Sequence, residues 1–452
     1  MPSTTLKNPQ TRGRVITSAD ADYYEARTIM VGGFDAHPAL IVRAADADDV
    51  ATVVRYARDT NLELAVRSGG HSGAGHGSTD GGIVLDLRDM KTIDLDVMAR
   101  SAWAETGLTA AEFSTAVGAH GLAVGFGDTG SVGLGGITVG GGIGYLVRKL
   151  GMTIDSLMAA EVVTADGELL HVDTHDHPDL FWAIRGGGGN FGVVTRFQFV
   201  LHDVPQVVGG MLMLPATAEA LAGFMAAAEA APEELSAVVN VMPAPPMPFV
   251  PEEHHGSLVI MALMWHAGEA DAGEAAMAPF RALATAIVDM VRPMPYAEIY
   301  PPEPGGDYHP TVEQQTLFLD SFDLSAARRI IEDLRTSDAP MRAVQLRVLG
   351  GAYARVPADA TAFAHRASGI LTVVVAVCES EQDRERRRAW VADLAGALRQ
   401  GDAGAYVNFL TDEDETRVRA AYPGETWDRL VSVKRKYDPT NLFHRNQNIP
   451  PA

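Results

Sequence analysis

The residue types best suited to chemistry are concentrated in one short run, Arg67-Ser68-Gly69-Gly70-His71-Ser72. The flanking segments 62–66 and 82–87 have the alternation or β-branching of strands. Adjacent glycines after a strand let backbone N–H groups approach an anion, because no Cβ blocks the way. Arg67 adds a positive charge, so the run predicts a cradle for a pyrophosphate group from which His71 projects. The alternative is an ordinary glycine turn with a solvent-exposed histidine.

A second glycine-rich stretch lies at residues 125–144 and contains ten glycines. Such a stretch cannot gain enough from its own side chains to offset the entropy of ordering its backbone. Something else should therefore hold it in place, and a large, flat, partly anionic ligand would do so. Gly187, Gly189 and Gly192 also satisfy the letters G-x-G-x-x-G, but a predicted helix precedes them and a strand follows. A dinucleotide fingerprint needs the opposite order, so we predict no Rossmann site.

Two further groups of residues could do chemistry. The segment 345–349 reads as a strand, in which the period of two places Gln345 and Arg347 on one face. His171, His175 and His177 form a local cluster, but the proline and acidic residues around them predict a loop, whereas a metal site needs ligands on one rigid face. We therefore predict no metal.

Composition limits the classes of partner. The 452 residues are enough for about three domains. The 36 basic and 58 acidic side chains give a net charge of −22, which disfavours nucleic acid and anionic membrane surfaces. The longest apolar run, residues 258–265, is too short to span a bilayer, and residues 1–15 carry no secretory pattern. One cysteine, Cys378, excludes an internal disulfide. We expect a cytoplasmic protein, monomeric or homodimeric.

Periodicity predicts the elements that must position these residues. The predicted helices are 47–61, 109–120, 178–185, 218–231, 272–286, 325–334 and 384–398. The predicted strands are a hairpin over 155–170 with an Asp-Gly turn, then 193–200, 208–214, 258–265, 343–349 and 371–377. Pro279 should begin its helix or kink it. The order fits a mixed α+β domain, 206–404, inserted between residues 1–205 and a returning segment, 405–452.

Several ordered motifs together resemble one family. They are R-S-G-G-H-S at 67–72, the glycine motif at 133–144, D-L-F-W-A-I-R-G-G-G at 179–188, F-G-V-V-T at 191–195 and Y-D-P at 437–439. The chain is thereby similar to the berberine bridge enzyme-like flavoprotein oxidases of the vanillyl-alcohol oxidase superfamily. The resemblance implies an α+β fold. A PCMH-type FAD-binding domain of two α/β subdomains would be joined to a substrate domain whose antiparallel sheet is covered by helices.

The resemblance also implies the cofactor and its contacts. It implies FAD covalently bonded to His71, in contact with Arg67, Ser68, Gly69, Gly70, Ser72, Thr129, Val132, Gly135, Gly136, Gly141, Gly142, Gly192, Val194, Asn446 and Asn448. Many relatives attach the flavin a second time through a cysteine, and Thr129 occupies that position here, so we expect a single histidyl bond. Val132 stands where relatives admit oxygen to the flavin, which favours an oxidase over a dehydrogenase.

The catalytic residues follow from the same resemblance. Gln345 and Arg347 stand where relatives carry a glutamate base, which favours an anionic or phenolate substrate. Tyr406 matches a tyrosine that removes a hydroxyl proton in several relatives, and a nearby Arg347 cation should lower its pKa. The alternative is that Tyr406 is a core aromatic residue and Arg347 a buried ion-pair partner.

Together these observations predict an FAD-dependent oxidase. It would take a hydride from a small organic substrate, an alcohol, phenol or amine of secondary metabolism, and reduce O2 to H2O2. One alternative is an FAD-dependent sugar or alcohol dehydrogenase that uses another electron acceptor. A second alternative is a flavin-binding protein without turnover. The expected partners are therefore a small-molecule substrate and O2.

Overall fold

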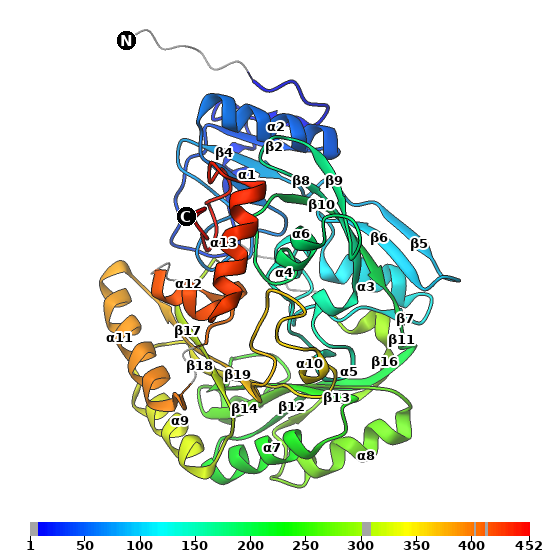
Figure 1. The fold of residues 1–452 in the computed structure, drawn as a ribbon. Helices are drawn as coiled ribbons and strands as arrows, with labels where there is room; N and C mark the ends of the chain where they lie inside the picture. Colours follow the sequence, from blue (N-terminus) through cyan, green and yellow to red (C-terminus); the bar gives the residue numbers. More distant parts are fainter. Residues whose placement is uncertain (1–7, 301–308, 402–403, 412–414) are drawn as a thin grey trace.

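The strands of the computed structural model, which describes residues 8–300, 309–401, 404–411 and 415–452, form four sheets. Sheets of four and five strands arise from the first 200 residues, and a sheet of eight strands from the next 180 or so (Figure 1). Parallel pairing occurs within the four-stranded sheet, while the five-stranded and eight-stranded sheets are antiparallel. The α+β class predicted from the sequence is confirmed.

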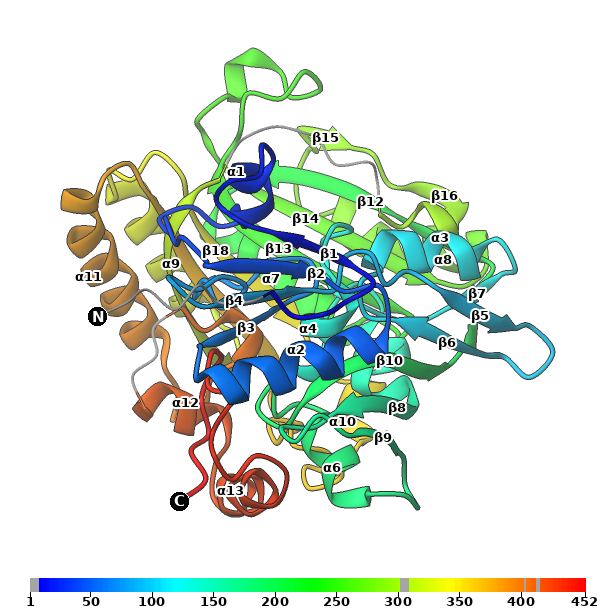
Figure 2. The same cartoon turned by 90° about the horizontal axis from the view of Figure 1, so that it is seen from above.

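The first sheet has the strand order β1-β2-β4-β3, and helix α2 covers one of its faces (Figure 2). Asp46 caps α2 by accepting the N–H of Asp49, and the buried valines of the helix pack on the sheet. The predicted helix 47–61 is thus confirmed to within one residue. The elements are β1 (Arg14–Ile16), α1 (Tyr23–Arg27), β2 (Leu40–Arg43), α2 (Ala47–Thr60), β3 (Leu64–Arg67) and β4 (Ile83–Asp86).

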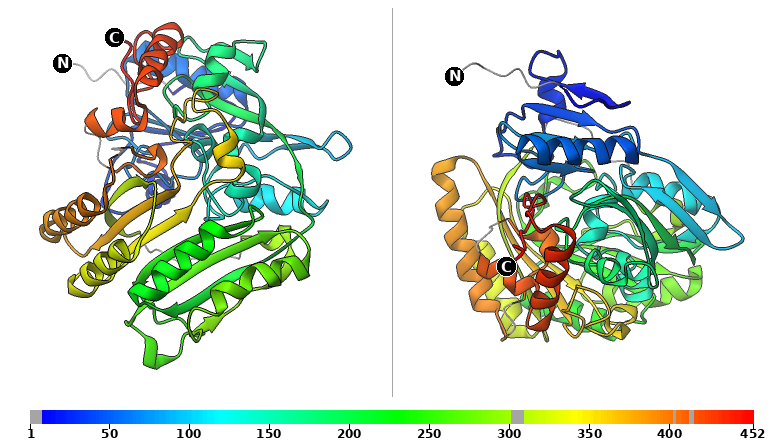
Figure 3. Two further views of the ribbon diagram at one scale, coloured as in Figure 1. Left: turned by 60° about the horizontal axis from the view of Figure 1, so that its bottom comes forward. Right: turned by 45° about the horizontal axis from the view of Figure 1, so that its top comes forward.

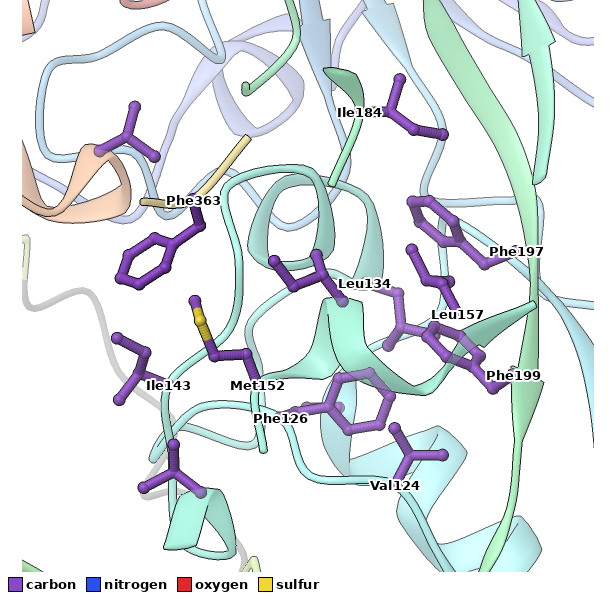
Figure 4. Close-up of a cluster of buried hydrophobic side chains, with 14 of the residues drawn as sticks. Val124, Phe126, Leu134, Ile143, Met152, Leu157, Ile184, Phe197, Phe199 and Phe363 are labelled. Atoms are coloured by element: carbon purple, nitrogen blue, oxygen red, sulfur yellow. The ribbon is translucent and has the colours of Figure 1, made fainter. Parts of the chain in front are cut away.

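The second sheet has the order β5-β6-β10-β8-β9, and its β8–β9 hairpin is the one predicted around Asp166-Gly167. Figure 4 shows its aromatic residues Phe197 and Phe199 packed with Phe126 and Leu134 beside α4. The elements of this part of the chain are β5 (Ile93–Asp96), β6 (Ser101–Glu105), α3 (Ala110–Gly118), β7 (Leu122–Ala123), α4 (Leu134–Val139), α5 (Val147–Leu150), β8 (Leu157–Val163), β9 (Leu169–Val172), α6 (Pro178–Ala183), β10 (Val193–Val200) and β11 (His202–Asp203), of which β7 and β11 form a separate two-stranded sheet.

The longer helices of this part of the chain cover one face of the eight-stranded sheet, where their apolar sides form a second core (Figure 3). The opposite face turns toward the first two sheets. The strands are β12 (Gln206–Pro215), β13 (Leu235–Pro243), β14 (Leu258–Ala267), β15 (Val288–Asp289), β16 (Arg292–Pro295), β17 (Thr311–Leu319), β18 (Arg342–Val348) and β19 (Ile370–Cys378). The helices on this face are α7 (Ala218–Ala230), α8 (Ala270–Arg281), α9 (Leu324–Thr336) and α11 (Glu381–Leu398), whereas the short α10 (Ala352–Arg355) packs against α5.

Most predictions for this region are confirmed, with two exceptions. Strands β13, β15, β16 and β17 and the short helix α10 were not predicted. Helix α8 begins at Ala270 and ends at Arg281, so the expected extension to residue 286 is wrong, and so is a start at Pro279. Pro279 instead lies in the last turn, where its missing N–H removes one hydrogen bond near the end of the helix.

The end of the chain returns to the first part of the molecule. Helices α12 (Glu415–Ala421) and α13 (Glu425–Tyr437) follow the eight-stranded sheet in sequence, and α13 packs against α6 (Figure 1). We therefore propose the division 1–205, 206–404 and 405–452 for the domains. Among the described residues, no helix combines the length and apolar character needed to cross a membrane.

Candidate functional site

A cavity of about 400 Å³ lies where the loop after β3, the glycine-rich loop before α4, strand β18 and the C-terminal segment meet. Most of the predicted site residues line it together: Arg67, Ser68, Gly69, Gly70, His71, Ser72, Thr129, Val132, Gly135, Gly136, Gly192, Val194, Arg347, Tyr406 and Asn446. Gly141, Gly142, Gln345 and Asn448 are not part of the lining. The topology thus brings together residues from the two ends of the chain.

Two glycines allow the two glycine-rich loops to touch. A Cβ on Gly69 would collide with the backbone of Gly133, and a Cβ on Gly133 would collide with Ser68 and Gly69. The Ser68 hydroxyl joins the loops further, because it donates to the Thr106 carbonyl at 2.6 Å and accepts the Gly135 N–H at 3.3 Å. This contact requires glycine at both positions, and it leaves backbone groups facing the cavity.

Arg67 does not present a free charge to the cavity. Its Nη2 lies 2.7 Å from Asp86 Oδ2, and both side chains are no more than 1% exposed. The guanidinium also donates to the carbonyls of Ala26 and Thr28, and burial lowers its pKa. Asp86 is shared with Arg88, whose Nη2 lies 2.8 Å from the same oxygen, so one carboxylate faces two guanidinium groups. That Arg67 supplies positive charge to an anion stays a prediction. The structural role of Arg67 is to fix the start of the loop.

His71 lies in the cavity wall with its ring half-buried. Its Nε2 is 3.2 Å from the hydroxyl of Ser131, a residue that sequence reasoning did not single out. Gly70, at φ 75°, turns the chain immediately before the histidine, a conformation that favours glycine. The loop geometry therefore places an imidazole nitrogen in a hydrogen-bonded position beside the glycine-rich stretch.

Two basic residues of the cavity were also missed. His76 is buried, its Nδ1 lies 3.3 Å from the Ser72 hydroxyl, and burial lowers its pKa to about 3, so the ring is neutral. Arg445 donates from Nε to the Ser78 carbonyl at 3.0 Å, and its nearest recorded carboxylate oxygen, on Glu63, is 3.8 Å away. Arg445 is thus a lining cation whose charge is weakly matched by the protein.

The C-terminal segment is held against the cavity by a buried clamp. Lys434 is fully buried and donates to Asp438 Oδ2 at 2.7 Å and to the carbonyls of Asn190 and Phe443, each at 2.8 Å. Asn190 in turn binds the Gln447 carbonyl and the Ile449 N–H. The clamp fixes the position of Asn446 and Asn448. The Oδ1 atoms of these two asparagines are buried and have no hydrogen-bond partner among the described residues.

Strand β18 places Arg347 in the cavity wall, as its predicted face requires. Its Nη2 lies 2.6 Å from Asp128 Oδ2, its Nη1 donates to the Ile143 carbonyl, and its Nε donates to Gln345 Oε1. The side-chain amide of Gln345 in turn donates to Asn240 Oδ1 at 2.9 Å. Asp128 was not singled out from the sequence. Because it neutralises Arg347, the inference that this arginine favours an anionic substrate is wrong.

Tyr406 is 1% exposed, and its hydroxyl oxygen accepts two N–H groups. The Gly142 N–H lies at 2.8 Å and the Asn408 Nδ2 at 3.0 Å. Burial raises the pKa of Tyr406, and these hydrogen bonds and Arg347 oppose the rise without overcoming it. The expected lowering of this pKa is therefore wrong in direction. The site holds a neutral phenol whose oxygen is fixed by two donors.

The chain matches two family models and several curated proteins. Residues 38–173 match the model described as an FAD binding domain, and residues 405–450 match the model described as berberine and berberine like. The (R)-6-hydroxynicotine oxidase of Paenarthrobacter nicotinovorans is 31% identical over 97% of each chain. A xylooligosaccharide oxidase of Thermothelomyces thermophilus is 27% identical over 91% of this chain and 88% of its own.

Solved structures share the fold over nearly the whole chain. The crystal structure of 6-hydroxy-D-nicotine oxidase from Arthrobacter nicotinovorans aligns with a TM-score of 0.86 and 29% identity, and covers 99% of this chain and 100% of its own. A BBE-like protein of Physcomitrella patens aligns with a TM-score of 0.85 and 22% identity over 98% and 97% of the two chains. The second match, at its lower identity, extends to the fold alone.

Proposed function

This chain belongs to the berberine bridge enzyme-like FAD-linked oxidoreductases, and on that premise we propose that it is an oxidase whose flavin is bonded to His71. It is an FAD-dependent oxidoreductase with a PCMH-type FAD-binding domain. The proposed reaction takes a hydride from a small organic substrate, an alcohol, phenol or amine, and yields H2O2 from O2.

One observation carries the covalent proposal. His71 projects from the tightly packed glycine loops into the cavity, with its Nε2 held 3.2 Å from the Ser131 hydroxyl. A single bond is proposed because Thr129 has no thiol and because Cys378, the one cysteine of the sequence, lies at the end of β19 outside the cavity lining. Ser131 would orient the imidazole of His71 toward the cofactor.

The residues around the cavity fit FAD. A Cβ on Gly136 would enter open space, so this wall leaves room for a flat group, and the buried Oδ1 of Asn446 offers an acceptor without a protein partner. Backbone N–H groups of the loop 68–72 suit a pyrophosphate, and Arg445 adds positive charge. When bound, FAD supplies the acceptor for the hydride. Val132 would control the approach of O2 from this wall.

Tyr406 has a defined role in the proposal. Its phenol oxygen is held by Gly142 and Asn408, so its own proton can be directed at a substrate bound in the cavity. Such a fixed phenol would orient a substrate hydroxyl or amine and exchange a proton with it. Two relatives are named as oxidases of 6-hydroxynicotine and of xylooligosaccharides, which supports a small-molecule substrate. We further propose a cytoplasmic monomer or homodimer without nucleic acid or membrane partners.

The test is a substrate screen in two stages. A panel of alcohols, phenols and amines is mixed anaerobically with the purified holoprotein, bleaching of the flavin is followed by absorbance, and O2 is then admitted while H2O2 is measured. An oxidase bleaches with at least one substrate and recovers its colour rapidly while releasing H2O2. Bleaching with slow recovery in O2 but fast recovery with an artificial acceptor would indicate the dehydrogenase. Failure of the whole panel to bleach the flavin would favour a protein without turnover.

A further inference from the structure

The ion pair between Asp128 and Arg347 fixes the charge of the part of the cavity that faces β18. Asp128 is the one carboxylate among the described residues that line the cavity. Its Oδ2 lies 2.6 Å from Arg347 Nη2, and the two side chains are 21% and 3% exposed. The pair joins the FAD-binding part of the chain to the eight-stranded sheet, 219 positions apart in sequence.

Arg347 makes four hydrogen bonds within the protein. Each of its three nitrogens donates a hydrogen bond, to Gln345, to the Ile143 carbonyl or to Asp128, and its guanidinium lies 4.9 Å from the centre of the Phe409 ring. A guanidinium fixed in this way has little freedom to turn toward a ligand. Its charge is also matched at hydrogen-bond distance. Arg347 is therefore a poor receptor for a substrate anion.

Asp128 keeps unused capacity as an acceptor. Its Oδ2 is taken by Arg347, whereas the recorded contact of its Oδ1 is a long one of 3.5 Å from the Thr129 hydroxyl. An ionised carboxylate can accept about four hydrogen bonds. Neighbouring Gln345 has no comparable capacity, because its carbonyl oxygen binds Arg347 and its amide binds Asn240. Asp128 Oδ1 is thus an acceptor in the cavity wall, on a carboxylate that Arg347 holds in place.

We propose that Asp128 sets the substrate class of this site by binding an O–H or N–H donor of an uncharged substrate, while its pairing with Arg347 makes the pocket reject carboxylates and phenolates. This inference rests on the proposed function, because it concerns the substrate of the same cavity. It replaces the anionic substrate inferred from Arg347 alone. A carboxylate placed near Asp128 would meet like charge, and Arg347, the cation beside it, is already paired with Asp128.

The test compares an anion with a neutral molecule of similar shape. Benzoate and benzyl alcohol are titrated into the flavin-loaded wild type and into Asp128→Asn, Arg347→Gln and the double variant, and binding is read from the absorption spectrum of the oxidised flavin. The wild type should bind benzyl alcohol more tightly than benzoate. Asp128→Asn, which leaves Arg347 unmatched, should bind benzoate at least ~10-fold more tightly than the wild type does. Arg347→Gln should bind it more weakly, and the double variant should return to the wild-type value.

Equal benzoate affinity in the wild type and Asp128→Asn, including no detectable binding by either, overturns the proposal, as does a wild type that prefers benzoate. Asp155→Asn is a matched control, because Asp155 pairs with the buried Arg366 at 2.7 Å outside the cavity lining and should leave benzoate affinity unchanged. If Asp128→Asn fails to load flavin, Arg347→Gln tests the same ion pair by removing its positive member. Its benzoate affinity should then fall below that of the wild type. The titration follows the absorption spectrum of the flavin whether or not the flavin is covalently bound. A negative result for Asp128 is therefore distinct from a failure of the proposed bond to His71.

Discussion

Replacing Lys434 by methionine should destabilise the protein strongly and loosen the cofactor site. Lys434 is fully buried, as is Asp438, and its ammonium donates to that carboxylate and to two backbone carbonyls. Burial lowers the pKa of Lys434, and Asp438 opposes that effect. Methionine keeps most of the side-chain volume, so the substitution removes the charge and the hydrogen bonds and leaves little cavity.

The magnitude follows from what the substitution leaves behind. Asp438 would keep the N–H groups of Leu442 and Phe443 but lose its buried counter-charge. Breaking one side of a buried ion pair costs about 3–5 kcal/mol. The carbonyls of Asn190 and Phe443 also lose a donor, and these costs overlap with the first. A loss of about 4 kcal/mol is a large part of a typical unfolding free energy of about 5–15 kcal/mol.

Lys436 provides a matched control on the same helix. It is 57% exposed and pairs with Asp179 at the surface, so Lys436→Met should cost no more than about 1 kcal/mol. Guanidinium unfolding followed by tryptophan fluorescence measures both variants, and the absorbance ratio of flavin to protein measures cofactor content. Lys434→Met should also carry less flavin, because the clamp positions the segment 443–449. Indistinguishable midpoints and flavin contents for the two lysine variants would refute the clamp.

Two further predictions concern single side chains of the cavity. Tyr406→Phe removes the hydroxyl that is proposed to exchange a proton with the substrate, so flavin reduction by a substrate found in the screen should slow about 10²–10⁴-fold. The control Tyr422→Phe changes a buried tyrosine outside the cavity lining, and its flavin should be reduced at the wild-type rate. Equal slowing in both variants would argue against a role for Tyr406. Burial lowers the pKa of His76 from 6.5 to about 3. Between these two pH values the unfolded chain binds a proton that the folded chain does not, so the protein loses stability as the pH falls. Between pH 7 and pH 5 the wild type should therefore lose about 2 kcal/mol more than His76→Asn in denaturant unfolding, and equal losses would contradict the buried neutral ring.

The sequence predicted the elements whose signals are local. Helix α2 has an aspartate cap and apolar residues at helical spacing, and the β8–β9 hairpin has an Asp-Gly turn. Strand β17 mixes polar and apolar residues, with Glu313 buried by ion pairs from α11, so its pattern shows no clean alternation. Strand β13 is largely buried because it lies between β14 and β18 in the large sheet, and Ser236 and Asn240 alone interrupt its apolar residues, so its sequence shows no clear alternation.

The site was predictable where it consists of glycine runs and the histidine between them. Its polar contacts were not, because they join distant parts of the chain. Asp128 and Arg347 are 219 positions apart, and Lys434 and Asn190 are 244 positions apart. The ion pair of Arg67 was missed for the same reason, since its partner Asp86 reaches it only through the pairing of β3 with β4. The direction of the Tyr406 pKa depends on burial, which the sequence of its segment does not display.

The linkage of the flavin to His71 is the central claim and can be measured directly. The purified holoprotein is precipitated with acid, the pellet is digested, and the flavin-bearing peptide is identified by mass spectrometry, with His71→Ala as the control. We predict that the yellow colour stays in the pellet, that the added mass maps to the peptide containing His71 alone, and that the variant releases its flavin. Flavin that washes out of the wild type, or an added mass on another residue, would contradict the claim.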